Sequence, residues 1–366
     1  MSLNDMMAGL EPSRQGGLFD GIRKVVPYTP GEQPKGLDRI IKLNTNECPY
    51  SPSPRVMEVL AGIDGDLLRR YPSPDNEPLL SALSEYYGLD KKMIFTGVGS
   101  DDVLSMCFLT FFNSGRPVLF PDITYSFYDV WADVYRLPYK TLILDDDFRI
   151  DPTDYAVSNG GIVIANPNAP TGVSLDLDKI EYIVSHSRDS VVIVDEAYID
   201  FGGESALPLL ERHENLIVVR TMSKSRALAG LRVGYAFGNE RLIKYLCDVK
   251  FSVNSYTLSH PAIRGAVAAL EDDEYFKSVI GRIQSTRKAA EEALSSMGFV
   301  FNESKANFIF VKHERMDGAA LYEALRERGI FVRHFNKERI SDYLRITIGT
   351  DEEMDSLFSA LKEILP

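Results

Sequence analysis

The sequence predicts an α/β protein with a mostly parallel central sheet between helices, followed by a smaller C-terminal α/β domain. Apolar strand candidates alternate with helix candidates along most of the chain, which is the pattern of βαβ units. Several strand candidates are β-branched runs that are apolar on both faces, as in the buried strands of a parallel sheet. The chain has 366 residues and is 45% hydrophobic, which is enough for two domains and a large core.

The chain is predicted to begin with an arm and a large domain. Residues 1–42 are rich in glycine, proline and charge without a sustained period, so they predict an arm and not a domain of their own. Residues 43–258 are predicted to form the large domain. Its helices are expected at 77–87, 101–112 and 126–135. Its strands are expected at 93–96, 117–120, 161–165, 190–194, 216–220 and 233–237.

Residues 259–366 are predicted to form the smaller domain, because the pattern changes near residue 259 to a long helical stretch. That stretch is expected to continue through residue 297. The remaining elements are expected to be strands at 307–311 and 344–348 and helices at 317–328 and 351–365.

Composition excludes several classes of protein. The net charge of −13 argues against sequence-independent nucleic-acid binding, which depends on Lys and Arg contacts to phosphates. Cys48, Cys107 and Cys247 are odd in number and widely spaced, so neither a disulfide framework nor a metal site is expected. The first 21 residues lack the pattern of a signal peptide, and no apolar run has the length of a membrane span. We therefore expect a cytoplasmic protein that binds no membrane.

The segment from Thr221 to Tyr235, TMSKSRALAGLRVGY, carries the most specific chemistry. Lys224 follows an apolar strand, and Arg232 comes eight positions later among small residues. A lysine amine can form a Schiff base with an aldehyde, while the Ser223 hydroxyl and the Arg232 guanidinium suit a phosphate. Pyridoxal phosphate combines both groups. A lone lysine on a loop is usually a solvated charge, so this interpretation needs support from other segments.

Other polar residues follow predicted strands, where ligands bind in open α/β sheets. Asp195 ends a buried strand and can pair with a pyridinium nitrogen, although a helix N-cap is the plainer alternative. Segment 95–101, FTGVGSD, reads as a strand, a glycine turn and a helix start whose N–H groups can bind phosphate. Segment 166–172, NPNAPTG, holds amides able to bond a phenolic oxygen, but by itself it predicts only a loop.

Aromatic and cationic residues complete the candidate site. Tyr125 follows a strand and can stack on a heteroaromatic ring, whereas the adjacent Phe127 and Tyr128 are expected to pack in the core. Arg333 and Arg345 lie within or beside apolar strands, where an unpaired guanidinium is costly. Such arginines indicate an anionic ligand.

Taken together, these segments resemble the fold-type I pyridoxal-phosphate enzymes and, within them, the histidinol-phosphate aminotransferase family. The likeness runs from Pro27 to the last helix, and the order and spacing of its motifs are more specific than any one of them. The motifs are PYTPG, LNTNECPY, RYP, GVGSDD, DEAYIDF, SK with LAGLRVGY, and LRITIGT.

The resemblance implies a role for each matching residue. Lys224 would bind the cofactor aldehyde and then move a proton between substrate and cofactor, Asp195 would hold the pyridine nitrogen, and Tyr198 would bond the phenolic oxygen. The remaining cofactor contacts would come from Gly99, Ser100, Asp101, Tyr125, Asn168, Ser223 and Arg232, with Tyr71 reaching the phosphate from the neighbouring subunit of a homodimer. Substrate would be recognised by Tyr28, Asn46, Arg333 and Arg345.

The sequence departs from the family at one position. The family commonly has asparagine directly before Pro-Thr-Gly, where this chain has Ala169. A shift of one residue would let Asn168 serve instead.

The resemblance implies transamination between L-histidinol phosphate and 2-oxoglutarate, giving imidazole acetol phosphate and L-glutamate in histidine biosynthesis. Two arginines suit a phosphate monoester as well as a carboxylate, which a transaminase with dissimilar substrates requires. The alternatives are an aromatic-amino-acid or broad-range aminotransferase, a threonine-phosphate decarboxylase, and a regulatory module that binds pyridoxal phosphate without turnover. The last usually carries a DNA-binding domain, and the short arm here cannot be one.

Overall fold

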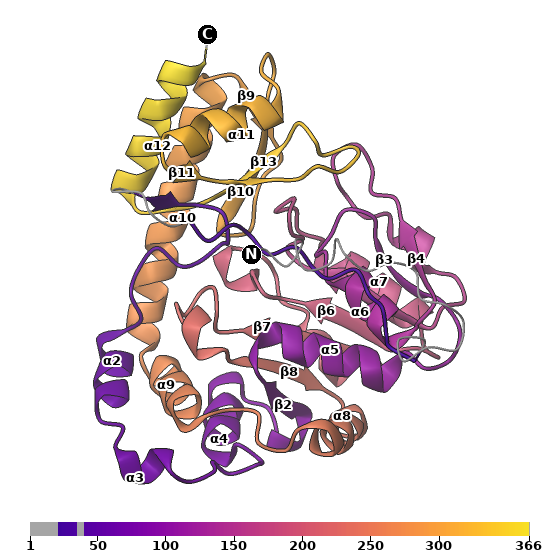
Figure 1. The fold of residues 1–366 in the computed structure, drawn as a ribbon. Coiled ribbons are helices and arrows are strands. Elements are labelled where there is room, and N and C mark those ends of the chain that lie inside the picture. The colour runs from indigo at the N-terminus through magenta and orange to yellow at the C-terminus, as the bar shows by residue number, and fades with distance from the viewer. Residues whose placement is uncertain (1–20, 35–39, 366) are drawn as a thin grey trace.

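The computed structural model describes residues 21–34 and 40–365, and its centre is a seven-stranded sheet (Figure 1). The strand order is β2-β8-β7-β6-β5-β3-β4. Strands β3 to β7 pair in parallel, and β8 lies antiparallel between β2 and β7. The prediction of a mostly parallel sheet is therefore confirmed. The strands are β2 (Ile94–Gly97), β3 (Val118–Pro121), β4 (Tyr139–Leu142), β5 (Gly161–Ala165), β6 (Val192–Asp195), β7 (Leu216–Thr221) and β8 (Gly234–Gly238).

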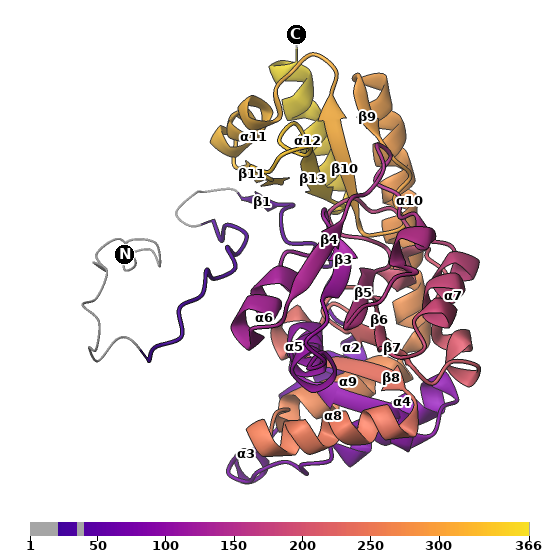
Figure 2. The same ribbon diagram turned by 90° about the vertical axis from the view of Figure 1, so that its right-hand side faces the viewer.

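Helices cover both faces of this sheet because its strands are apolar on both faces. In β6, Ile193 packs with Phe108 of α5, whereas Val192 and Val194 pack on the other face with Ile180 of α7. Figure 2 shows α6 and α7 on opposite sides of the strands. The helices are α2 (Pro54–Ala61), α3 (Gly65–Leu68), α4 (Glu77–Tyr87), α5 (Gly99–Phe111), α6 (Tyr128–Tyr135), α7 (Leu177–His186), α8 (Glu240–Val253) and α9 (His260–Glu271).

A second, antiparallel sheet of four strands has the order β12-β13-β10-β9 and packs against α10, α11 and α12. Its elements are α10 (Asp273–Ser296), β9 (Phe299–Phe301), β10 (Phe308–His313), α11 (Gly318–Glu327), β12 (Arg333–His334), β13 (Leu344–Thr347) and α12 (Asp351–Ile364). Beside it, β1 (Ile41–Lys42) pairs in parallel with β11 (Ile330–Phe331). The chain therefore contacts its C-terminal part before it enters the large sheet.

Short 3₁₀ helices join several of these elements, at Lys91–Met93 (η1), Pro152–Tyr155 (η2), Ile199–Phe201 (η3), Leu207–Glu211 (η4) and Ala229–Leu231 (η5). Within residues 21–34 and 40–365, no helix is long and apolar enough to cross a membrane.

The helical stretch expected from residue 259 to residue 297 is broken at Asp272, whose φ of −101° and ψ of 62° end α9. Ile263 and Ala266 of α9 pack with the same core cluster as Leu79 of α4, on one face of the large sheet. Helix α9 therefore packs with the large sheet, although the sequence analysis assigns it to the smaller domain. The division at residues 42 and 258 stays a prediction.

The arm predicted for residues 1–42 falls partly outside the described residues. Residues 21–34 contain no helix or strand. Tyr28 stacks on Phe127 with ring centroids 4.1 Å apart, and Arg23 donates to the carbonyl of Val134. This segment therefore contacts α6 and the residue that precedes it.

Candidate functional site

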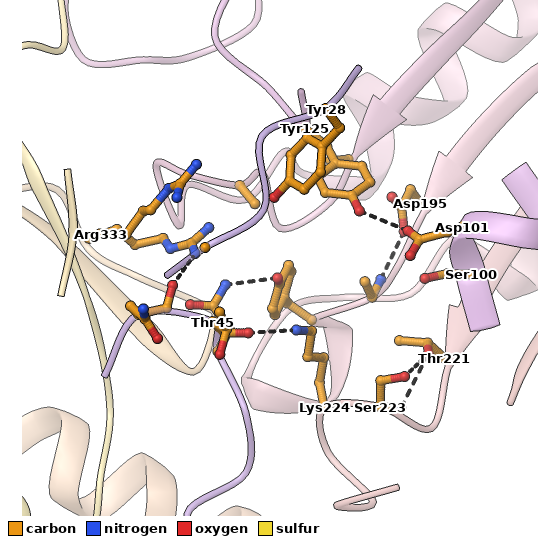
Figure 3. Close-up of a pocket in the computed structure, with 18 of the residues that line it drawn as sticks. Tyr28, Thr45, Ser100, Asp101, Tyr125, Asp195, Thr221, Ser223, Lys224 and Arg333 are labelled. Atoms are coloured by element: carbon orange, nitrogen blue, oxygen red, sulfur yellow. Dashed lines mark hydrogen bonds between the residues drawn. The ribbon is translucent and has the colours of Figure 1, made fainter. Parts of the chain in front are cut away.

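A cavity lies between the large sheet and the C-terminal sheet, and the N-terminal segment contributes to its wall (Figure 3). Asp195 at the end of β6 lies at this cavity, as do Lys224 after β7 and Arg345 of β13. Most of the residues predicted from sequence line it: Tyr28, Asn46, Ser100, Asp101, Tyr125, Asp195, Tyr198, Ser223, Lys224, Arg232, Arg333 and Arg345. Figure 3 shows Lys224 between Arg333 on one side and Ser100 and Asp101 on the other.

Lys224 stands on the loop that follows β7. Its Nζ donates to the carbonyl oxygen of Thr45 at 2.9 Å and lies 5.8 Å from the centroid of the Tyr198 ring. The next residue, Ser225, donates to Oδ2 of Asp200 at 2.5 Å, which fixes the loop. A lysine held by a single backbone carbonyl at a cavity wall is free to react with a bound carbonyl compound.

Asp195 is buried, with 5% of its surface exposed. The hydroxyl of Tyr128 donates to Oδ2 at 2.9 Å, and the backbone N–H of Ala197 donates to Oδ1 at 3.2 Å. Burial raises the pKa of Asp195 to about 6, against the opposite effect of the Tyr128 hydrogen bond. The helix N-cap alternative is excluded because Tyr198 occupies the N-cap of η3, the next helix.

An anion cradle, formed by Gly99, Ser100, Ser223 and Arg232, lies at the start of α5. The N-cap of α5 makes no side-chain hydrogen bond, which leaves its first N–H groups available to a ligand. Gly99 has a φ of +82°, and a Cβ added there would lie 2.5 Å from Nη2 of Arg232. The Arg232 guanidinium also donates to the Ser223 hydroxyl at 3.4 Å. Helix N–H groups, a hydroxyl and a guanidinium together suit a phosphate.

Asp101 connects this cradle to the aromatic wall. Its two carboxylate oxygens accept from the Tyr125 hydroxyl at 2.7 Å and from Arg232 at 3.3 Å. The Tyr125 ring packs on Phe127 and Trp131, with centroids 5.6 Å and 6.2 Å away. The Tyr125 side chain is thus fixed at the cavity wall by a hydrogen bond at its hydroxyl and by aromatic packing of its ring.

The opposite side of the cavity is cationic. Arg345 donates to the carbonyl of Asn44 at 2.9 Å, its Nε is buried without a partner, and burial lowers its pKa. Arg333 donates to the carbonyls of Thr29 and Pro30 at 3.2 Å and 3.4 Å. In the part of the chain that the structure describes, neither arginine forms an ion pair. This side is therefore suited to an anionic substrate.

Asn168 does not line the cavity. Its Oδ1 accepts from Thr124 at 2.8 Å, and its Nδ2 donates to the Ile123 carbonyl and to Thr171 at 2.9 Å and 3.0 Å. Ala169 faces the cavity instead. The one-residue shift suggested by the sequence is therefore not seen, because the Asn168 amide is already used to tie loops together.

Tyr71 also lies away from the cavity of its own chain. Tyr71 is 80% exposed, and its ring packs on that of Tyr256 with centroids 4.7 Å apart. Tyr71 therefore does not contribute to the cavity of its own chain.

Sequence reasoning missed several lining residues. Asn44 and Thr45 lie inside the motif LNTNECPY, so a signal was present, but nothing local showed that the Thr45 carbonyl meets Lys224. Tyr128 does not line the cavity, and the sequence predicts only that it packs in the core, so its hydrogen bond to Asp195 was missed as well. The other missed lining residues are Gly31, Ala165, Ala169, Ala197 and Thr221.

Comparison with known proteins agrees with this geometry. The family described as aminotransferase class I and II matches residues 38–361. The histidinol-phosphate aminotransferase of Lactococcus lactis subsp. cremoris (strain SK11) is 50% identical over 346 residues, which cover 94% of this chain and 97% of that protein. Histidinol-phosphate aminotransferase 1 of Hydrogenovibrio crunogenus is 51% identical over 344 residues, covering 94% and 96%.

A solved structure shares the fold. The crystal structure of histidinol-phosphate aminotransferase from Sinorhizobium meliloti in complex with pyridoxal-5'-phosphate matches with a TM-score of 0.82 and 26% identity, covering 89% of this chain and 92% of that one. The family match over residues 38–361 shows that this chain belongs to the class I and II aminotransferase family.

Proposed function

We propose that this protein is a pyridoxal-phosphate-dependent aminotransferase that acts on L-histidinol phosphate and 2-oxoglutarate. The products are imidazole acetol phosphate and L-glutamate, and the reaction belongs to histidine biosynthesis. One observation carries the proposal: one cavity holds the Lys224 amine between the anion cradle and Arg333 and Arg345, which form no ion pair within the described residues. The relatives at about half identity are histidinol-phosphate aminotransferases, which agrees with this substrate pair.

The residues present fit pyridoxal phosphate. The anion cradle suits its phosphate, and a Cβ at Gly99 would push into the guanidinium of that cradle. Asp195 suits its pyridine nitrogen, because a buried carboxylate gains a cationic partner there. Lys224 suits its aldehyde. When bound, the cofactor supplies an electron sink for the bond that breaks at the substrate carbon.

Lys224, Asp195 and Tyr198 perform the proton chemistry in this proposal. The Lys224 amine moves a proton between the substrate carbon and the cofactor, and Asp195 keeps the pyridine nitrogen protonated. The Tyr198 hydroxyl accepts from Nδ2 of Asn46 at 2.8 Å, so its own proton is free to donate to the phenolic oxygen. Since Ala169 offers no amide, Tyr198 is the side chain we assign to that oxygen.

Arg333 and Arg345 bind both substrates in turn. A phosphate monoester and a dicarboxylate share negative charge and oxygen acceptors, which a guanidinium fork recognises. Arg333 now donates to the carbonyls of Thr29 and Pro30, so a bound anion would compete with the N-terminal segment for it. Tyr28 lines the same cavity from the aromatic side, where its ring stacks on Phe127, and we assign it a contact to the substrate.

We further propose a homodimer in which Tyr71 reaches the cofactor phosphate of the neighbouring subunit. Tyr71 lies against Tyr256, and both side chains are exposed. Exposed aromatic and apolar side chains close together are typical of an interface. The cytoplasmic location stays a prediction.

A spectrophotometric half-reaction tests the function. The protein is loaded with pyridoxal phosphate, histidinol phosphate is added, and the change in visible absorbance is followed. We expect saturable conversion that 2-oxoglutarate reverses. Conversion by phenylalanine or tyrosine but not by histidinol phosphate would favour an aromatic aminotransferase. Release of CO2 without an oxo-acid product would indicate a decarboxylase, and binding without turnover a regulatory module.

A further inference from the structure

The buried tyrosine that begins α6 has a polar contact that packing does not require. Tyr128 is 0% exposed, and its ring is enclosed by Phe108, Phe120 and Trp131 at centroid distances of 6.2 Å, 5.8 Å and 6.2 Å. Phenylalanine would fill the same space. A hydroxyl in such a place costs free energy unless it is hydrogen-bonded.

The hydroxyl of Tyr128 is aimed at one acceptor, Oδ2 of Asp195, at 2.9 Å. Oδ1 of the same carboxylate accepts from the backbone of Ala197 at 3.2 Å. The two donors together fix the rotation of the carboxylate. The carboxylate has further lone pairs to offer, and Asp195 lines the cavity.

Some of the charged groups around Asp195 oppose its ionisation, and others favour it. Asp101 of α5 and Glu196, the next residue along the chain, are both negative and raise the pKa of Asp195. Arg220 of β7 lies 2.8 Å from Glu196 and offsets that charge, while Lys224 and Arg232 line the same cavity. The side-chain hydrogen bond that favours the ionised form comes from Tyr128.

We propose that Tyr128 is a positioning residue that keeps the Asp195 carboxylate ionised and oriented to receive a pyridinium nitrogen. This inference rests on the proposed function, since it concerns the same cofactor. Tyr128 touches neither cofactor nor substrate in this scheme. It acts through Asp195 alone.

The test compares the dissociation constant for pyridoxal phosphate of Tyr128→Phe and wild-type apoprotein from about pH 8.5 to about pH 5.5. The ratio of the two constants cancels the titration of the cofactor itself. Loss of the hydrogen bond from Tyr128, which favours the ionised carboxylate, raises the pKa of Asp195. We therefore expect a ratio near one at high pH that rises about tenfold at low pH, where the variant must lose a proton to bind.

Tyr135→Phe is the matched control. It makes the same change on the same helix, but the Tyr135 hydroxyl bonds to the Ser105 hydroxyl at 2.7 Å and does not line the cavity. Its ratio should stay near one at every pH. A flat ratio for Tyr128→Phe, or one that tracks the control, would overturn the inference.

A second variant covers the case in which Tyr128→Phe does not fold. Replacement of Tyr128 by 3-fluorotyrosine keeps the ring and makes the hydroxyl a stronger donor, so the ratio should fall below one at low pH. A ratio that rises, or does not change, contradicts the inference. If the protein binds no pyridoxal phosphate at all, the proposed function fails. Urea unfolding of the apoprotein then decides: stability must fall more steeply with rising pH in Tyr128→Phe than in wild type.

Discussion

The contribution of Asp195 to the stability of the apoprotein should fall as pH rises from about 4.5 to about 7. Asp195 is buried, and burial raises its pKa from 3.8 to about 6. The folded protein therefore binds a proton on Asp195 more tightly than the unfolded chain does. The stabilisation from this proton is fully present below the unfolded pKa and is lost as pH rises through the folded pKa.

The size of the effect follows from the shift. Two pKa units correspond to about 3 kcal/mol, of which about 2 kcal/mol is lost between about pH 4.5 and about pH 7. Other groups also titrate in this range, so the measurement is a difference. The free energy of unfolding is measured in urea for wild type and for Asp195→Asn, without phosphate or sulfate in the buffer. Asparagine keeps the shape and does not titrate.

The expected result is that the wild-type free energy minus that of Asp195→Asn decreases by about 2 kcal/mol over this range. A difference that stays constant would show that Asp195 is not stabilised by protonation. A difference that increases with pH would mean that its folded pKa is depressed, and the assignment of burial as the dominant effect would be wrong. Bound pyridoxal phosphate should weaken the decline, because a pyridinium partner favours the carboxylate.

Three further predictions concern the surroundings of the site. Gly99→Ala should weaken pyridoxal phosphate binding and destabilise the protein by about 1 kcal/mol. Gly115→Ala, at a φ of +75° with open space for a Cβ, should destabilise the protein without weakening binding. Equilibrium binding and urea unfolding measure the two effects. Arg220→Met should lower the free energy of unfolding in urea by about 3–5 kcal/mol, because it leaves the Glu196 carboxylate buried without its cationic partner. Adding Glu196→Gln should restore much of the lost stability. If the two substitutions instead lower the stability additively, the pairing is contradicted. Asn168→Ala should lower the free energy of unfolding by about 1–3 kcal/mol and change the affinity for pyridoxal phosphate little. A large loss of affinity at unchanged stability would show that Asn168 binds the cofactor.

Much of the fold could be predicted because its strands carry strong local signals. The run 161–165 coincides with β5, and the predicted strand at 216–220 lies within β7. Other elements lack such signals. Strand β4 is an edge strand with three exposed residues, so no apolar pattern marks it. The break at Asp272 was missed because the residues on both sides continue a helical pattern, while α9 and α10 pack on different clusters.

The sequence predicted individual residues of the candidate site but not the hydrogen bonds between them. Asp195 and Lys224 could be recognised because they lie at or just after the end of a strand, and Arg232 because it shares a specific motif with Lys224. The bond between Tyr128 and Asp195 joins residues 67 positions apart, and no local pattern encodes it. The choice between Asn168 and Ala169 at the cavity wall depends on the path of one loop, which the residue types do not determine.

Several buried polar groups that destabilise the apoprotein lie at this cavity, which supports its assignment as a binding site. Among the described residues, Asn44 Oδ1 and Arg345 Nε are buried polar atoms without a partner that belong to residues lining this cavity. Asp195, whose ionisation is opposed by burial, lines it too. Each such group lowers the stability of the apoprotein, so their meeting from distant parts of the chain is not favoured by folding alone. A ligand with a cationic ring and anionic oxygens would supply partners for Asp195 and Arg345, and its binding would stabilise the folded state by an amount that grows with its concentration.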